Sequence, residues 1–502
     1  MKEEQFNQLP SQGTIYSVGR LGSHLIIGTG NYGKIYAHIW ASIMQQLPLQ
    51  NLPYECDIIS IDAYIDAFPV LAVAYVQKCN ASTNGAIPDG MGKGGFVTSH
   101  LNIYSTWISV DQDSPTSTSS TSSDGSRIKS TFHPKEEFHS SQFELLAQNC
   151  TNFLLDYIPY HLYHIPVVKE NGNFGNILLI SGSDKKIHSY EADEDNLTFI
   201  EVPVKTYFPE LAQTFPSICT RILIQPVNEL TRRITMCGLE SGNLLIWVVT
   251  SKFHRRRRMD SETTVTSGSI TPSKSIHDAF EGMSISETKD TTSTSRARDI
   301  IQLWEKSNKS TNHVTKSDES SPESACAEDG ECMTDSMLES LDESFETIEH
   351  YYEGLITSIK SYTDGFSLNI IVASALSPTY VYTNVIEEHF RAGSPLKFSS
   401  RWDAVECCCV EDVDRDGENE IIIGTFGCAL LVYKYMDEIL PEWVIVCKRI
   451  LPRNILAIEF VSPDLLVVTG LGLHVINYDT SAYFTNRPGT TTTTANHPQP
   501  IQ

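Results

Sequence analysis

The sequence predicts an all-β protein that folds as one seven-bladed β-propeller with disordered low-complexity insertions. Three observations lead to this prediction. Hairpin-like segments recur seven times, further short strands flank several of them, and stretches rich in Ser, Thr and acidic residues account for the irregular spacing. Because small sheets arranged radially bury both of their faces and leave only short edges, seven four-stranded units favour a propeller.

Each predicted hairpin consists of a β-branched run, a turn with Gly or small residues, and a second run that ends in or near an aromatic residue. The hairpins begin at Ser23, Phe68, Gly175, Arg232, Phe366, Glu418 and Pro463. We expect them to form the inner strands of the blades. Two stacked β-sandwiches remain an alternative, because hairpin repeats alone do not require the sheets to close into a ring.

Further short strands complete the four-stranded units. "CDIISIDAY" precedes the hairpin at Phe68, "AVECCCV" precedes Asp412, and "EWVIVCKRI" follows Tyr435. The segment "RDIIQLWEK" from Arg298 lies within a long polar stretch and has enough apolar residues to pair with a sheet. We predict that it is the outer strand of its blade.

The predicted propeller spans residues 14–480, with disordered insertions at about 111–135, 252–295 and 307–349 and a disordered tail at 487–502. These segments have too little apolar surface to offset the loss of chain entropy on folding. Residues 260–349 contain 20 acidic and 7 basic residues, so they supply 13 of the 25 net negative charges. The predicted folded part is therefore much less acidic than the whole chain.

Composition disfavours several classes of function. A net charge of -25 is unfavourable for nucleic-acid binding, because phosphates attract a surplus of Lys and Arg. No apolar run approaches the roughly 20 residues that cross a bilayer, and the first residues, "MKEEQFNQLP", do not resemble a signal peptide. Twelve scattered cysteines fit reduced thiols. We therefore expect a cytoplasmic protein without a transmembrane segment.

The stretch "DVDRDGENE" is the strongest candidate for a metal site. Oxygen side chains at alternate positions converge on a hard cation such as calcium, and Gly417 permits the sharp turn. The EF-hand pattern fails, since Ile423 stands where the bidentate Glu would be and a strand follows. A shorter calcium loop between the first two strands of a blade fits better. Its candidate ligands are Asp412, Asp414, Asp416 and Glu420.

Two other interpretations of this stretch remain open. An Asp-rich turn can be held by hydrogen bonds from its own backbone, without a metal. A pair of catalytic carboxylates would need a concave apolar pocket, which nothing in the sequence indicates. We identify no nucleophile, nucleotide-binding or metalloprotease motif in its required context, so we expect a protein that is not an enzyme and requires no cofactor.

Several collinear segments resemble the kaptin family. They include "HLNIYSTW", "ILLISGSDKKIHSYE", "YFPEL" and, above all, "DVDRDGENEIIIGTFGCALLVYKY". The resemblance extends over roughly residues 14–478, apart from the insertions. The sequence departs from the family in its acidic insertions and in "FVSPDLLVVTG", where kaptins can carry a further Asp-rich loop.

The resemblance implies an integrin-alpha-like (FG-GAP-type) propeller that serves as a scaffold subunit of a KICSTOR-like complex. Such a complex tethers the GATOR-type GTPase-activating complex at the lysosomal membrane and restrains TOR complex 1 signalling when amino acids or glucose are scarce. The implied partners are a second FG-GAP-type propeller subunit and a large scaffold subunit. The family is also associated with actin filaments in lamellipodia and other cell projections, so an actin-binding protein is the alternative.

Overall fold

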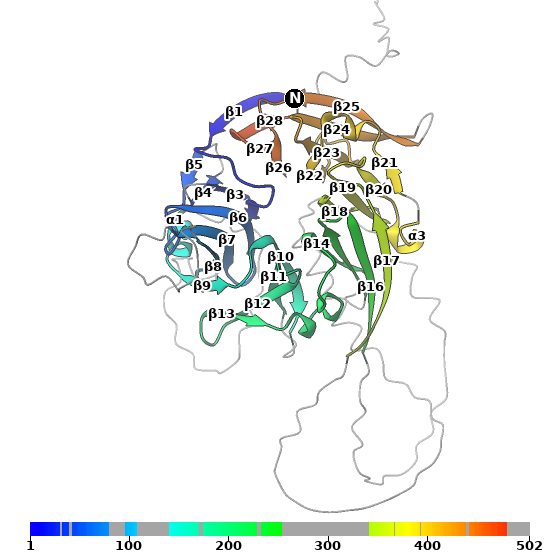
Figure 1. Cartoon of the computed structure of the whole chain (residues 1–502). Helices are drawn as coiled ribbons and strands as arrows, with labels where there is room; N and C mark the ends of the chain where they lie inside the picture. Colours follow the sequence, from blue (N-terminus) through cyan, green and yellow to red (C-terminus); the bar gives the residue numbers. More distant parts are fainter. Residues whose placement is uncertain are drawn as a thin grey trace, which may run out of the picture.

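The computed structural model describes residues 1–30, 33–39, 43–79, 96–107, 140–169, 174–227, 232–253, 341–365, 367–391, 393–437 and 441–478. Within these residues, seven four-stranded antiparallel sheets surround a central axis (Figure 1). The predicted seven-bladed propeller is thus confirmed. The helices of the described part are short: α1 (Ser140–Leu146), α3 (Val385–Glu388) and the 3-10 turns η2 (Val204–Thr206), η3 (Pro209–Leu211) and η5 (Ser399–Trp402).

Each blade uses consecutive strands except the last. The first three sheets are β2 (Val18–Leu21), β3 (His24–Thr29), β4 (Lys34–Ile39) and β5 (Ile43–Gln46); β6 (Cys56–Ile65), β7 (Pro69–Cys79), β8 (Phe96–Ser105) and β9 (Cys150–Leu155); and β10 (Pro159–Val168), β11 (Phe174–Gly182), β12 (Ile187–Asp193) and β13 (Thr198–Val202).

The next three are β14 (Cys219–Val227), β15 (Arg232–Leu239), β16 (Asn243–Phe253) and β17 (Leu341–Tyr351); β18 (Ile356–Asp364), β19 (Ser367–Ser374), β20 (Tyr380–Tyr382) and β21 (Gly393–Pro395); and β22 (Val405–Glu411), β23 (Glu420–Thr425), β24 (Ala429–Met436) and β25 (Glu442–Ile450). The seventh combines β26 (Ile455–Val461), β27 (Asp464–Thr469) and β28 (Gly472–Asn477) with β1 (Lys2–Gln8).

The predicted hairpins supply the second and third strands of the blades. The strand upstream of each hairpin is the innermost one, and the first strands of neighbouring blades contact one another around the axis (Figure 1). Our expectation that the hairpins are the inner strands was therefore wrong by one position. A repeat signal identifies the most strongly patterned strands, and these are the buried pair in the middle of each sheet.

Two outer strands differ from the prediction. The fourth strand beside β16 is β17, which pairs with it from Asn243↔Tyr351 to Phe253↔Leu341. It overlaps the predicted insertion 307–349 and takes the place that we assigned to "RDIIQLWEK", whose residues 298–306 lie outside the described part. The propeller also begins before residue 14, because β1 pairs with β28. The predicted insertion 111–135 and tail 487–502 also lie outside the described residues.

Glycine in the second strand permits close packing between neighbouring blades. A Cβ atom at Gly28 would come within 2.6 Å of Ile58, and one at Gly424 within 2.5 Å of Ile455. Each Ile belongs to the first strand of the following blade, so even a methyl group at these glycines would push the blades apart. The glycine in the repeated "IIGT" therefore serves packing between the blades.

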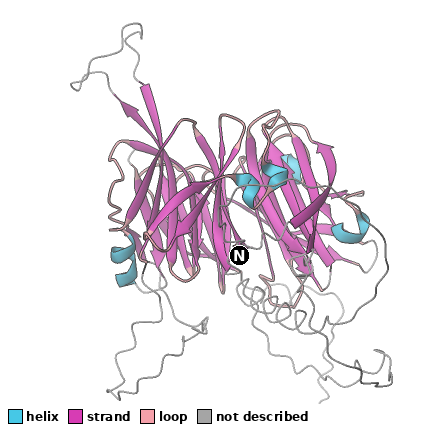
Figure 2. Ribbon diagram, turned by 90° about the horizontal axis from the view of Figure 1, so that it is seen from below, coloured by secondary structure: helices cyan, strands magenta, loops and turns pink. Residues whose placement is uncertain are grey.

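Every blade has the same polarity along the axis. We use the term start face for the end of the propeller at which the first strand of each blade begins. The second and third strands are joined at this face, and the fourth strand ends there. The other end of the propeller is the opposite face. Figure 2 shows the strands running between these two ends. Among the described residues, no helix has the length and apolar character to cross a membrane.

Candidate functional site

The acidic loop, residues 412–420, joins β22 to β23 on the opposite face. Asp412 accepts hydrogen bonds from the backbone N–H groups of Asp416 and Gly417, at 3.1 and 3.0 Å. Gly417 has a φ of 97°, a conformation that costs glycine little because it has no Cβ. Asp416 accepts from the N–H of Glu418 at 3.0 Å. The loop therefore has the side-chain-to-backbone bonding typical of an Asp-rich turn.

Glu420 lies beneath this loop at the start of β23 and has no exposed surface. Its Oε2 atom accepts hydrogen bonds from the backbone N–H groups of Val413 at 3.0 Å and Asp414 at 3.4 Å. Burial raises the pKa of Glu420 to about 7, even though the contact with Lys434 favours ionisation. The carboxyl group thus titrates near neutral pH.

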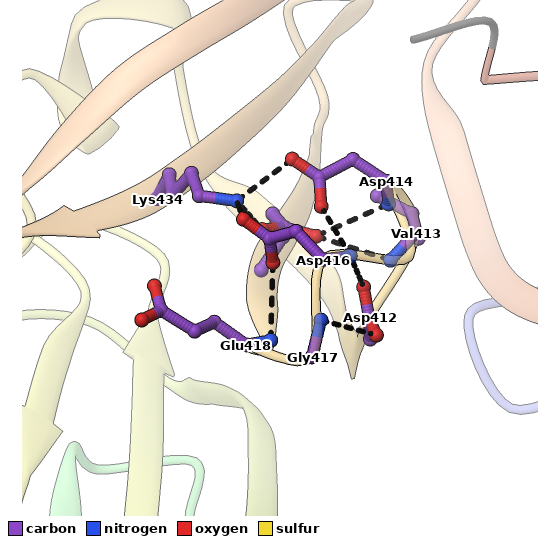
Figure 3. Close-up of polar contacts among 8 residues, drawn as sticks. Asp412, Val413, Asp414, Asp416, Gly417, Glu418 and Lys434 are labelled. Atoms are coloured by element: carbon purple, nitrogen blue, oxygen red, sulfur yellow. Dashed lines mark hydrogen bonds and ion pairs between the residues drawn. The ribbon is translucent and has the colours of Figure 1, made fainter.

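Lys434, from β24, lies among the carboxylates (Figure 3). Its Nζ atom is 2.7 Å from Asp414 Oδ2 and 2.9 Å from Glu420 Oε1, and it also contacts Asp416. Burial opposes the charge on Lys434, but the three carboxylates outweigh this effect and raise its pKa. For Asp416, burial opposes ionisation, whereas Lys434 and the N–H of Glu418 lower the pKa overall. The lysine therefore partly neutralises the loop from within.

The structure brings the four predicted ligands together in one loop, but it divides their roles. Single oxygens of Asp412, Asp414 and Glu420 lie within 4.8 Å of one another, as ligands of a metal would. The oxygen donors suit calcium. However, Lys434 contacts two of these three residues, so a cation would have to displace its ammonium group. Calcium binding at this loop stays a prediction.

Sequence reasoning missed Lys434, although the hairpin register contains a signal for it. Ile421 pairs with Tyr433 in the β23–β24 ladder. One further step along this antiparallel ladder places Glu420 opposite Lys434, and oppositely charged residues at such positions attract each other. The Asp pattern drew attention to the loop, while the neutralising charge came from the next strand.

The "YFPEL" segment contributes a second buried carboxylate. Both oxygens of Glu210 accept hydrogen bonds from Arg233, with Nε at 2.9 Å and Nη2 at 2.8 Å. The hydroxyl group of Thr235 also donates to Glu210 at 2.6 Å. These bonds tie the loop after β13 to β15, so this motif has a structural role.

Solved structures with a similar arrangement include BBS1N in complex with ARL6DN, soaked with mercury. This structure has 10% sequence identity, covers 96% of this chain and 97% of its own, and gives a TM-score of 0.44. Another is Sqt1 of Saccharomyces cerevisiae, with 7% identity, coverage of 93% and 83%, and a TM-score of 0.40.

Comparison at the level of sequence is more informative. The KICSTOR complex protein kaptin of Mus musculus is 22% identical in an alignment that covers 95% of this chain and 87% of the mouse protein. The sequence profile of the family described as KICSTOR complex protein kaptin matches residues 126–308 and 335–485, about two thirds of the chain. The chain therefore belongs to the family of the KICSTOR complex protein kaptin.

Proposed function

We propose that the chain is a non-catalytic scaffold subunit of a KICSTOR-like complex. In this role it helps to recruit the GATOR-type Rag GTPase-activating complex to lysosomes, and it thereby restrains TOR complex 1 signalling during amino-acid or glucose deprivation. The observation that carries the proposal is the family match over residues 126–308 and 335–485. A propeller suits such a role because its rigid faces present loops to several partners at once.

The proposed partners are a second FG-GAP-type propeller subunit and a large scaffold subunit. The proposed location is the cytoplasm, with peripheral attachment at the lysosomal membrane through these partners. Actin binding was the alternative expectation from the sequence, but neither the geometry nor the comparisons favour it.

Affinity purification of the tagged full-length chain from its own cells tests this function. We expect mass spectrometry to identify both a propeller partner and a large scaffold protein. Cells that lack the chain should retain phosphorylation of TOR complex 1 substrates after amino-acid withdrawal, whereas normal cells lose it. Recovery of actin without either subunit, together with a normal starvation response, would reject the proposal.

A further inference from the structure

A group of aromatic and basic residues lies at the start face of the blade that begins with β22. We call this group the Trp402 patch: Phe398, Arg401, Trp402, Phe426 and Lys448. Phe398 is 64% exposed and Phe426 is 53% exposed, so both are among the more exposed aromatic side chains of the described residues. The Arg401 guanidinium and the Lys448 ammonium lie 5.9 and 5.3 Å from the centre of the Trp402 ring. A cation within about 6 Å of an aromatic face is attracted to the ring, so these contacts hold the two basic groups beside Trp402.

Backbone contacts unite the loops that carry these residues. The N–H of Phe426 donates to Ala404 O at 2.8 Å, and that of Gly427 donates to Trp402 O at 3.2 Å. A Cβ atom at Gly427 would lie 2.3 Å from Trp402 O, so only glycine permits this approach. The β23–β24 turn and the segment around η5 therefore form one continuous surface.

One residue of the patch and two residues beside it have backbone conformations that carry an energetic cost. Phe398, Asp403 and Cys428 have φ values of 66°, 67° and 68°. These values lie in the left-handed region, which residues other than glycine rarely adopt. Each such residue costs about 1–3 kcal/mol, and such residues cluster at binding sites. At Phe398 this conformation presents a large apolar side chain to water. Stability alone does not explain the arrangement.

The charge of the patch is opposite to that of the chain. Arg401, Lys448 and the neighbouring Arg453 are exposed. The acidic residue nearest in the sequence is Asp403 for Arg401, Glu442 for Lys448 and Glu459 for Arg453. The other nearby basic residues already have partners, since Lys397 contacts Glu442 and Arg449 contacts Glu3. A local positive surplus on a chain of net charge -25 favours an acidic ligand.

We infer that the Trp402 patch is a docking site for an acidic segment of a partner protein that carries a bulky apolar side chain. Its carboxylates pair with Arg401 and Lys448, while its apolar side chain packs against Phe398 and Phe426. This arrangement combines an aromatic anchor with charges that set orientation. The inference deepens the proposed function, on which the identity of the partner rests.

The direct test uses the purified full-length chain and fluorescein-labelled peptides of Asp, Glu and Leu, with Ser-substituted peptides of equal length as controls. We expect anisotropy to show salt-sensitive binding of the acidic peptides that contain Leu. The double variants F398S/F426S and R401E/K448E should each weaken binding at least tenfold. Leu197→Ser is the matched control, because Leu197 is 59% exposed, has a φ of 51° and lies on the opposite face between β12 and β13.

The same variants are then compared in affinity purification from cells. Variants that melt like the wild type but capture at least tenfold less of the scaffold or propeller subunit support the inference. The inference would be overturned if the wild type and the variants bind the peptides equally and capture the subunits equally. It would also be overturned if the variants lose binding to phosphatidylserine vesicles while their peptide binding and protein capture are unchanged. If the wild type captures neither subunit, the proposed function fails, while the peptide experiment still decides the role of the patch.

Discussion

At the scale of single residues, the meaning of the acidic loop depends on a lysine from another strand. The Asp pattern alone is compatible with a calcium loop or with an empty turn. Lys434 Nζ contacts Asp414, Asp416 and Glu420, so a positive charge already lies where a metal would be attracted. The remaining oxygens largely accept backbone hydrogen bonds. A metal at this loop must therefore compete with an internal ion-pair network.

Replacement of Lys434 by Met should separate the two interpretations. The variant leaves three carboxylates without their cation, and we expect a loss of about 2–4 kcal/mol in the free energy of unfolding, since one partner of a largely buried ion pair is removed. Millimolar calcium should then raise the melting temperature of Lys434→Met more than that of the wild type. The control K434M/D414A should lose this increment. Equal, negligible calcium shifts in all three proteins would identify the loop as a turn that binds no metal.

Glu420 predicts a specific pH dependence of stability. Its folded pKa of about 7 exceeds the ordinary value of 4.5, so the native state binds the extra proton between these values. The contribution of Glu420 to stability should therefore fall as pH rises from about 4.5 to about 7, with a slope of at most about 1.4 kcal/mol per pH unit. The stability of Glu420→Gln relative to wild type should rise over this window in urea unfolding. Parallel curves for the two proteins would contradict the raised pKa.

At the scale of elements, the strands that the sequence failed to indicate are outer ones. The inner three strands of the β22 blade are mostly buried, and their β-branched runs are visible in the sequence. In contrast, "KEEQFNQ" in β1 and "LDESFETIEHY" in β17 are rich in acidic and other polar residues. An outer strand needs only one row of ladder hydrogen bonds and one partly covered face, so composition reveals little of it. The apolar "RDIIQLWEK" was the more attractive strand by composition, although β17 occupies that edge.

The N-terminal strand also closes the ring, and this predicts that two of its first residues, Glu3 and Lys2, contribute differently to the free energy of unfolding. Glu3 contacts Arg449 of the preceding blade, and its Oε1 atom is 2.9 Å from Nδ1 of the buried His474 on β28. We expect Glu3→Ala to lower the free energy of unfolding by about 1–3 kcal/mol. Lys2→Ala is the control, because Lys2 is 73% exposed and pairs only with its neighbour Glu4 among the contacts of its side chain that the structure describes; its cost should stay below about 0.5 kcal/mol. Similar unfolding curves for both variants would show that these contacts do not stabilise closure.

At the scale of the whole molecule, closure and charge distribution follow from contacts that are distant in sequence. The repeat of hairpins, together with the need of each small sheet to bury both faces, favoured seven blades, but the repeat alone did not require the sheets to close into a ring. The pairing of Lys2 with Asn477 could not be predicted in this way, because no local pattern specifies the partner of an end strand. For the candidate site, all four carboxylates were found from their spacing, but the Lys434 contact and the Trp402 patch required the three-dimensional register. Both arise where adjacent strands or loops meet.

The last prediction concerns the long segment between β16 and β17. Both strands remain complete when residues 260–335 are deleted, because β16 ends at Phe253 and β17 begins at Leu341. The deletion removes most of the connection, and loop-closure entropy favours the shorter loop by about 0.6 kcal/mol per halving of its length. We therefore expect an equal or slightly higher melting temperature and unchanged capture of the partner subunits.

A matched variant that retains 298–306 tests whether "RDIIQLWEK" is needed at a blade edge, and on the present structure it should behave identically. Because Ser/Thr-rich acidic segments can act as docking sites that phosphorylation controls, loss of capture by a deletion variant with an unchanged melting temperature would assign partner recognition to this segment.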